Sequence, residues 1–263
     1  MKTFVTRSVL RFALGFALAN FFLLAAVAQQ APANPPASPQ PQPAGQSKDA
    51  PDPKTRENTP GTSNDRLFYA LPNFLTLENS GNVPPLTAGQ KFKVVARGTF
   101  DYIQIPWYSA LAGISQAENS EPGYGQGAQG YGKRWGAAFA DGSIENFMTG
   151  AVLPSLLRQD PRFFQSSQGG FFHRTEYAVS RIFITRSDSG HHQFNFSEIF
   201  GSAMSAAIST YSYHPQADRT LANTASVWGT QVGYDTITIV VKEFWPDLRR
   251  KLSKKKQPPS NPG

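Results

Sequence analysis

Apolar and polar residues recur along most of the chain with the three-to-four-residue spacing of α-helices. The helices that this spacing predicts cover, approximately, residues 88–96, 101–117, 133–157, 197–210 and 221–244. Thr87 and Ser197 carry the kind of side chain that caps a helix N-terminus. Because proline ends or bends a helix, Pro154 is expected to interrupt the third helix, and Pro246 to follow the end of the last.

Residues 173–185 fit two descriptions. Tyr177 and Arg181 are four positions apart, as are Ala178 and Ile182, which places each pair on one face of a helix. Residues 181–185, in contrast, alternate as in a strand. We favour the helix, so the sequence predicts an all-α fold, a compact multi-helix bundle.

Small residues recur four positions apart on several of the predicted helices. They are Gly132, Gly136 and Ala140; Gly201, Ser205 and Ser209; Ala203 and Ala207; and Gly229 and Gly233. A stripe of small side chains lets two helix backbones approach closely, as in many membrane helices. No segment after residue 28 has an apolar run long enough to cross a bilayer. We therefore expect a water-soluble bundle, with a bundle that lies on or dips into a membrane as the alternative.

The first 28 residues have the pattern of an export signal. Lys2, Arg7 and Arg11 precede an apolar run over residues 12–27, and a small-residue motif ends at Ala28. The run is shorter than the roughly 20 residues that span a bilayer. Residues 1–28 are therefore expected to be a signal peptide that is cleaved after Ala28, and the mature protein to reside in the periplasm or cell envelope.

Composition divides the mature chain into three parts. Residues 29–64 are rich in Pro, Ala, Gln, Ser and Thr, so we expect a disordered spacer. Residues 65–252 have the size and apolar content of one helical domain, and residues 253–263 form a basic, Pro-containing tail expected to be disordered. The chain has no cysteine, which excludes a lipidated cysteine, disulfides and thiolate metal ligands.

The positive charge of the chain is concentrated at its two ends. Of the formal net charge of +7, three basic residues lie in the signal peptide, and six more follow residue 248, so the body between them is near neutral. The six are Arg249, Arg250, Lys251, Lys254, Lys255 and Lys256. Near an anionic membrane each contributes about 1 kcal/mol of attraction. Export makes nucleic acid an improbable partner for the same charge, and a solubilising tail without a partner is the alternative.

The glycine-rich segment before the third helix resembles two nucleotide-binding strings. Residues 125–130 fit G-x-G-x-x-G, and residues 127–133 fit the start of a phosphate-binding loop. No strand precedes the segment, and Arg134 replaces the hydroxyl residue that would hold magnesium. We therefore expect no nucleotide and no cofactor, and interpret the glycines as residues that allow positive φ angles.

Catalytic candidates are few. Asp141 and Glu145 are one helical turn apart, and such a pair divides acid and base roles only where the two environments differ. His191 and His192 are adjacent in a polar turn near Asp188, which is too few ligands for zinc, so no metal site is expected.

Four strings in the body resemble those of a group of uncharacterised exported bacterial proteins. They are Tyr131-Gly132-Lys133-Arg134-Trp135-Gly136-Ala137-Ala138, Gln159-Asp160-Pro161-Arg162-Phe163-Phe164, Thr185-Arg186-Ser187-Asp188-Ser189-Gly190 and Glu243-Phe244-Trp245-Pro246-Asp247. The resemblance implies one exported domain and no known activity.

The sequence therefore favours a non-catalytic cell-envelope protein whose helical domain contacts a membrane surface or a protein partner. The alternative is an envelope hydrolase that acts on lipid or polymer. For that activity Asp141 and Glu145, and then His191, are the candidate catalytic residues.

Overall fold

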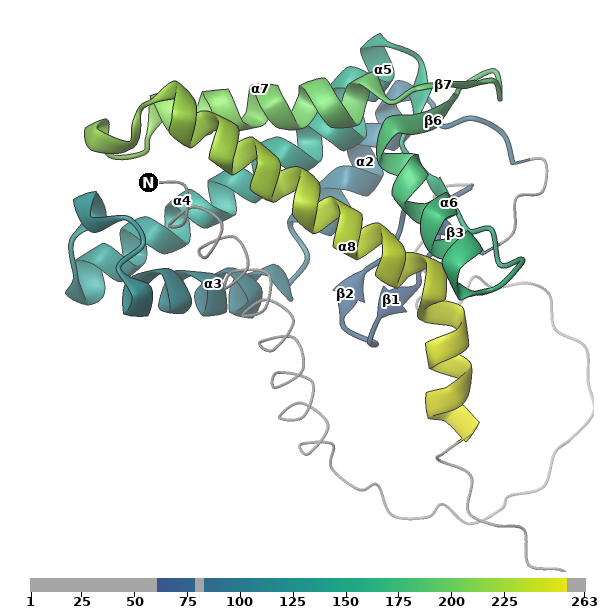
Figure 1. Ribbon diagram of the computed structural model, residues 1–263, viewed down its shortest axis with the longest axis horizontal. Coiled ribbons are helices and arrows are strands. Elements are labelled where there is room, and N and C mark those ends of the chain that lie inside the picture. Colours follow the sequence, from purple (N-terminus) through teal and green to yellow (C-terminus); the bar gives the residue numbers. More distant parts are fainter. Residues whose placement is uncertain (1–60, 79–82, 255–263) are drawn as a thin grey trace, which may run out of the picture. The chain divides into compact units, whose positions relative to one another are not determined.

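The computed structural model describes residues 61–78 and 83–254, with side chains as far as Ser253. The predicted signal peptide, residues 29–60 of the predicted spacer, and residues 255–263 of the tail lie outside the described residues. In the described part 67% of the residues are helical and the strands are few and short, which confirms the predicted all-α class (Figure 1).

Helices account for most of the described chain. They are α2 (Ala88–Thr99), α3 (Gln104–Glu118), α4 (Gly127–Phe147), α5 (Leu153–Leu156), α6 (Phe171–Phe183), α7 (Phe196–Ser212) and α8 (Leu221–Lys254). A π-helical turn, Met148–Val152, joins α4 to α5. The 3-10 turns cover Pro122–Tyr124 and Gln216–Asp218.

The strands are short, and they either precede α2 or lie between successive helices. They are β1 (Arg66–Leu67), β2 (Leu71–Pro72), β3 (Thr76–Leu77), β4 (Gln159–Asp160), β5 (Phe163–Phe164), β6 (Ile184–Ser187) and β7 (His192–Phe194). β1 pairs with β2 antiparallel, and β3 pairs with β5 parallel. β4, β6 and β7 form an antiparallel sheet in that order.

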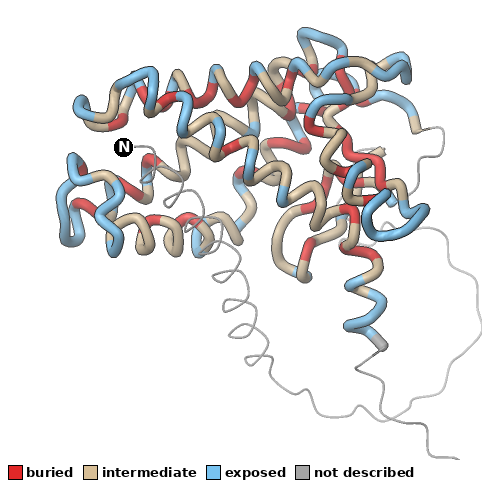
Figure 2. The backbone as a smooth tube through the Cα atoms, viewed as in Figure 1, coloured by how far each residue is buried: buried red, intermediate tan, exposed pale blue. Residues whose placement is uncertain are grey.

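The long helix α8 crosses two other helices (Figure 1). Its first half packs on α7, where the Trp228 indole N–H donates to the Ser202 hydroxyl at 3.0 Å, and its second half packs on α6. α4 packs between α3 and α7. Figure 2 shows buried positions where the helices meet and exposed positions along the outer side of α7 and the last turns of α8.

Apolar contacts concentrate beneath α2. Val94 and Val95 of α2 pack with Phe74, Leu86 and Ala151 in the buried core. A second contact covers the fully buried Trp245 of α8, whose ring centroid is 5.1 Å from that of Phe68 and 5.6 Å from that of Tyr69. The β1–β2 turn therefore folds over α8.

The last four residues of the predicted spacer, 61–64, are among the described residues and contact the helical domain. The Ser63 N–H donates to the Phe74 carbonyl at 2.9 Å, and the Arg97 guanidinium donates to the Asn64 side chain at 2.7 Å. These contacts place residues 61–64 in the folded domain, because backbone hydrogen bonds and not composition decide the boundary.

Two helix starts follow from local hydrogen bonds. The Thr87 hydroxyl accepts from the Gln90 N–H at 3.3 Å and the Gln90 side chain accepts from the Thr87 N–H at 2.9 Å, so α2 begins with the predicted cap. α3 begins at Gln104 and not at Asp101. The Asp101 carboxylate instead accepts from the Ile103 N–H and from Arg66.

The glycine-rich segment is mostly helical. α4 begins at Gly127, well before the predicted start at residue 133. Gly125 and Gly127 have φ angles of +77° and +73°, which agrees with the role expected of the glycines. The buried Arg134 closes the turn, since its guanidinium donates to the carbonyls of Gly125 at 2.6 Å and Glu121 at 2.8 Å.

Pro154 does not end the helical segment that begins with α4, but the backbone before it forms a π turn in place of an α-helical turn. The π turn Met148–Val152 precedes it, and α5 carries Pro154 at its start and ends at Leu156. Proline supplies no N–H to the helical ladder, so a wider turn at this point accommodates the missing bond.

Residues 173–185 contain both of the expected structures. α6 continues to Phe183, and β6 begins at Ile184. The favoured helix is therefore correct for most of the segment, including residues 181–183 of the alternating stretch, and only Ile184 and Thr185 of that stretch lie in the strand.

Ser197 is not the cap of α7. The Asn195 side chain accepts from the Glu198 N–H at 3.2 Å and is the N-cap. Ser197 lies in the first turn, where its N–H and hydroxyl both donate to the Gln159 side-chain oxygen, at 2.8 and 2.6 Å. A distant partner of this kind is not visible in the local sequence.

The predicted end of α8 at Phe244 is wrong. The helix continues through Pro246 to Lys254, and Figure 1 shows it changing direction before its last turns. Pro246 leaves the Lys242 carbonyl without its usual donor. The buried Gln165 amide donates to that carbonyl, so a side chain replaces the missing helical bond.

The stripe of small residues on α7 packs closely. Gly201, Ser205 and Ser209 are buried, and a Cβ added at Gly201 would lie 3.1 to 3.3 Å from Thr149 and the Met148 backbone. Gly136 of α4 and Gly233 of α8, in contrast, are exposed with open space where a Cβ would lie. Gly132 and Gly229 have the same open surroundings. Close small-residue packing is thus a property of α7 against the π turn.

Within the described ranges, none of the helices has both the length and the apolar content that crossing a bilayer requires.

We predict opposite effects for two Gly→Ala substitutions. Gly201→Ala should lower the free energy of unfolding by about 1–3 kcal/mol, because the methyl group forces α7 away from the π turn. Gly136→Ala should raise it by about 0.5–1 kcal/mol, because alanine favours an exposed helix position. Urea unfolding followed by circular dichroism measures both, and equal effects would contradict the assigned packing.

Candidate functional site

The two carboxylates of α4 that the sequence singles out lie in different surroundings. Asp141 and Glu145 share one face of the helix, as their spacing predicts. Asp141 contacts Tyr213 and His214, which follow α7, whereas Glu145 interacts with the charged groups of Glu198 in α7 and Asp235 in α8. The structure therefore divides the pair between two clusters.

The first cluster surrounds His214, which is 3% exposed. Its Nε2 lies 3.2 Å from one oxygen of Asp141, and its Nδ1 lies 3.2 Å from Glu121. The Tyr213 hydroxyl donates to Asp141 at 2.5 Å. Both carboxylate oxygens of Asp141 are thus within hydrogen-bond distance of side chains from the segment that follows α7.

Charge pairing dominates the protonation of this cluster. Burial lowers the pKa of His214, but the hydrogen bonds and negative charges of Asp141 and Glu121 outweigh it and raise that pKa to about 10. Burial and then Asp141 raise the pKa of Tyr213 above its ordinary range. At neutral pH the histidine is therefore a cation between two carboxylates, and a cation does not act as a general base.

The second cluster lies between α4, α7 and α8. It contains Glu145, Glu198, Asp235 and Lys242. Each residue keeps some exposed surface, but one side-chain oxygen of Glu145 and one of Glu198 are buried without a hydrogen-bond partner among the described atoms. Lys242 interacts electrostatically with Asp235 and Glu198, whereas the electrostatic partners of Glu145 are the carboxyl groups of Asp235 and Asp141.

Burial suppresses charge in this second cluster. Burial, followed by the charges of Asp235 and Asp141, raises the pKa of Glu145 to about 9. Burial and then Asp235 also raise the pKa of Glu198, and burial lowers the pKa of Lys242. Glu145 is therefore protonated at neutral pH.

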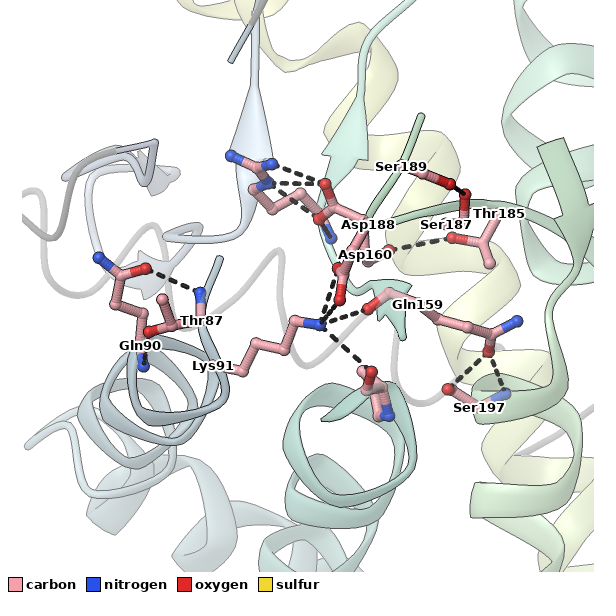
Figure 3. Close-up of polar contacts among 12 residues, drawn as sticks. Thr87, Gln90, Lys91, Gln159, Asp160, Thr185, Ser187, Asp188, Ser189 and Ser197 are labelled. Atoms are coloured by element: carbon pink, nitrogen blue, oxygen red, sulfur yellow. Dashed lines mark hydrogen bonds and ion pairs between the residues drawn. The ribbon is translucent and has the colours of Figure 1, made fainter. Parts of the chain in front are cut away.

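A third cluster, shown in Figure 3, surrounds the buried Lys91 of α2. Its Nζ lies 2.8 Å from both oxygens of Asp188, 2.8 Å from the Gln159 carbonyl and 3.2 Å from the Pro154 carbonyl. These acceptors satisfy the ammonium group fully. Lys91 therefore joins α2 to the start of α5, to β4 and to the β6–β7 turn.

Two of the four strings noted in the sequence meet at this lysine. The Thr185 hydroxyl donates to the Asp160 carbonyl at 3.0 Å, and β4 pairs with β6 (Figure 3). Asp160 also pairs with the buried Arg162 at 2.6 Å, and Arg162 in turn donates to the Pro84 carbonyl. The Asp160–Arg162 pair is local, but the other contacts join separate segments of the chain, which indicates a structural role for both strings.

His191 does not join either carboxylate cluster. It lies exposed in the turn before β7, where its backbone N–H donates to the Ser187 hydroxyl at 3.1 Å. Asp188, the neighbour considered as a partner in metal binding, is held by Lys91. Among the described residues, no three His, Cys, Asp or Glu side chains are grouped so as to hold a metal ion.

The basic residues at the end of α8 divide into two groups. Arg249 forms ion pairs within the domain, with Asp65 at 3.0 Å and with Glu78 at 2.6 Å. Arg250 is 70% exposed and pairs with Asp247, and Lys251 is exposed. The side chain of Lys254, and the whole of Lys255 and Lys256, lie outside the described residues.

Four residues of these clusters were not predicted from the sequence: Lys91, Glu198, Asp235 and Lys242. One signal was present: Asp235 and Lys242 are seven positions apart in an apolar stretch of α8, which puts both on one helix face. Charges in such a position need buried partners. No comparable local signal marks Lys91.

Comparison with family models, curated proteins and solved structures found no match to this chain. The resemblance to exported bacterial proteins therefore stays a prediction.

The raised pKa of Glu145 predicts a pH-dependent stability. Between the ordinary value of 4.5 and about 9, the folded protein binds more protons at this group than the unfolded chain does. The free energy of unfolding therefore falls as pH rises through that interval. Glu145→Gln removes the pH-dependent contribution of this carboxyl group. The free energy of unfolding of the variant should therefore exceed that of the wild type by about 1–3 kcal/mol near pH 8 and equal it near pH 5.

Chemical unfolding at several pH values measures this difference. Glu118→Gln, at an exposed position of α3, is the matched control and should show no comparable trend. A difference between Glu145→Gln and wild type that does not change with pH would contradict the burial of a protonated Glu145.

Proposed function

We propose that this protein is a non-catalytic component of the bacterial cell envelope whose helical domain binds an anionic membrane surface through the C-terminal end of α8. The observation that carries the proposal is the exposed basic end of that helix. Lys251 is exposed and Arg250 is mostly exposed, and three further lysines follow within five residues in the sequence.

Electrostatics supports a lipid surface as the partner of this end. Arg249 is excluded from the binding charge because Asp65 and Glu78 pair with it. Lys251, Lys254, Lys255 and Lys256 are the main binding residues, with Arg250 shared with Asp247. Each basic residue near an anionic leaflet contributes about 1 kcal/mol, so together they supply several kcal/mol of salt-sensitive attraction.

The N-terminal sequence supports the location. The basic residues, apolar run and small-residue motif of the first 28 residues are those of a cleaved export signal. In the proposed function this signal delivers the domain to the envelope, where anionic lipid headgroups are accessible to it.

The hydrolase alternative gains less support from the described residues. The Asp141 oxygens contact Tyr213 and His214, and His191 lies in a separate exposed turn. A protonated Glu145 has the proton of a general acid, but its electrostatic partners are other carboxyl groups, those of Asp141, Glu198 and Asp235.

Vesicle binding tests the proposal. The mature chain should sediment with vesicles that contain phosphatidylglycerol at low salt, and should be released at high salt, because the attraction is screened. It should bind phosphatidylcholine vesicles weakly. Replacing Lys251, Lys254, Lys255 and Lys256 with Gln should weaken binding to the anionic vesicles at least tenfold, about 1.4 kcal/mol or more.

The control for this experiment replaces basic residues elsewhere in the domain. Lys93 of α2 and Lys133 of α4 are exposed, and their replacement by Gln should leave binding unchanged. Equal binding by wild type and the four-lysine variant, or no wild-type binding to anionic vesicles at all, would rule out the proposed function.

A further inference from the structure

Two phenylalanines project beside the basic end of α8. Phe172 is 85% exposed, the highest value of any large apolar side chain in the described ranges, and Phe171 is 62% exposed. Single exposed apolar residues are ordinary on protein surfaces. Adjacent exposed aromatic residues at the first turn of a helix are harder to explain by packing alone, because neither ring is buried by the fold.

Ring contacts place these phenylalanines against α8. The Phe171 ring stacks on Phe244 with centroids 5.1 Å apart, and the Phe172 ring lies edge-on to Phe171 at 5.5 Å. Leu248 and Leu252 follow Phe244 at intervals of four residues and therefore lie on the same face of α8. Both leucines are exposed. The apolar surface thus extends from the start of α6 along the last turns of α8.

An ion-pair network fixes this arrangement. Arg174, one turn into α6, donates to Glu243 at 2.8 Å and to Asp247 at 2.5 Å. Its guanidinium also lies 4.5 Å from the centre of the Phe244 ring. The start of α6 is therefore held to α8 before any partner is present, which lowers the entropic cost of binding through these residues.

Charge decides which partner fits this surface. Arg250 and Lys251 lie in the same turns of α8 as Leu248 and Leu252, and more lysines follow in the sequence. Apolar and aromatic side chains beside basic residues are typical of segments that lie in the interface of an anionic bilayer.

A second apolar face does not have this combination. Phe196, Phe200, Met204, Ile208 and Tyr211 are exposed along α7, and that helix contains no Lys or Arg. It therefore offers no basic side chain of its own to anionic headgroups. The α7 face is therefore the competing site for a membrane.

We propose that Phe171 and Phe172, with Leu248 and Leu252, insert into the interfacial layer of an anionic bilayer while the basic end of α8 binds the headgroups. This inference rests on the proposed function and specifies how the domain holds the membrane. Phe171 and Phe172 are the insertion residues, Arg174 is a positioning residue, and the lysines provide the attraction.

The decisive variant is Phe172→Ala, because this ring contacts Phe171 at its edge and is otherwise exposed. Its partition coefficient onto phosphatidylglycerol-containing vesicles should fall about tenfold, as expected for removing one inserted aromatic ring. Phe172→Trp should keep wild-type binding. Phe183→Ala, at the other end of α6, and Met204→Ala, on α7, should change binding less than about twofold.

The outcomes separate this inference from the proposed function. If Phe172→Ala binds like wild type while the four-lysine variant does not bind, the insertion is refuted and the electrostatic function stands. If Met204→Ala loses binding and Phe172→Ala does not, α7 is the membrane face and the inference is again refuted. Unchanged circular dichroism and unfolding midpoint of Phe172→Ala establish that any loss of binding is not a loss of fold.

Discussion

The ion pair between Arg174 and Glu243 fixes how the longest helix meets the rest of the domain. Glu243 is fully buried, and its carboxylate accepts from Arg174 at 2.8 Å and from the backbone N–H groups of Ser166 and Ser167 at 3.0 Å. A buried carboxylate without these partners would be strongly destabilising. α8 can therefore cross α6 in only one register, and that register also places Trp245 beneath the β1–β2 turn.

The same constraint acts at other buried charges. Lys91 requires the carbonyl groups of Pro154 and Gln159 and the carboxylate of Asp188, and His214 requires Asp141 and Glu121. Each set brings together segments far apart in the sequence. In a domain without disulfides, polar pairs of this kind decide which helices meet, and apolar burial provides the driving force.

Helices could be predicted from the sequence because their apolar spacing is a local property. The cap at Thr87, the positive φ angles of the glycine-rich turn and the helical class all follow from nearby residues. Two of the errors have distant causes. Ser197 bonds to Gln159 instead of capping α7, and Gln165 supplies the hydrogen bond that allows α8 to pass Pro246.

The candidate sites were predicted less completely for the same reason. Asp141 and Glu145 could be identified as a pair on one helix face, but their different surroundings depend on residues of α7, α8 and the segment between them. The exposed Phe172 has no distinguishing feature in the sequence. Its significance depends on the contact between α6 and α8, which Arg174 and Glu243 hold in place.

We propose above all that the start of α6 and the end of α8 form one membrane-binding surface. Measuring how deeply spin labels at single positions enter the bilayer tests this proposal most directly. The natural chain has no cysteine, so Phe172→Cys and Met204→Cys each accept a single spin label. On anionic vesicles, collision with oxygen and a water-soluble relaxant should place the label at position 172 about 5–10 Å into the headgroup and acyl boundary, and the label at position 204 in water. A label at position 172 that stays in water on bound protein would contradict the account.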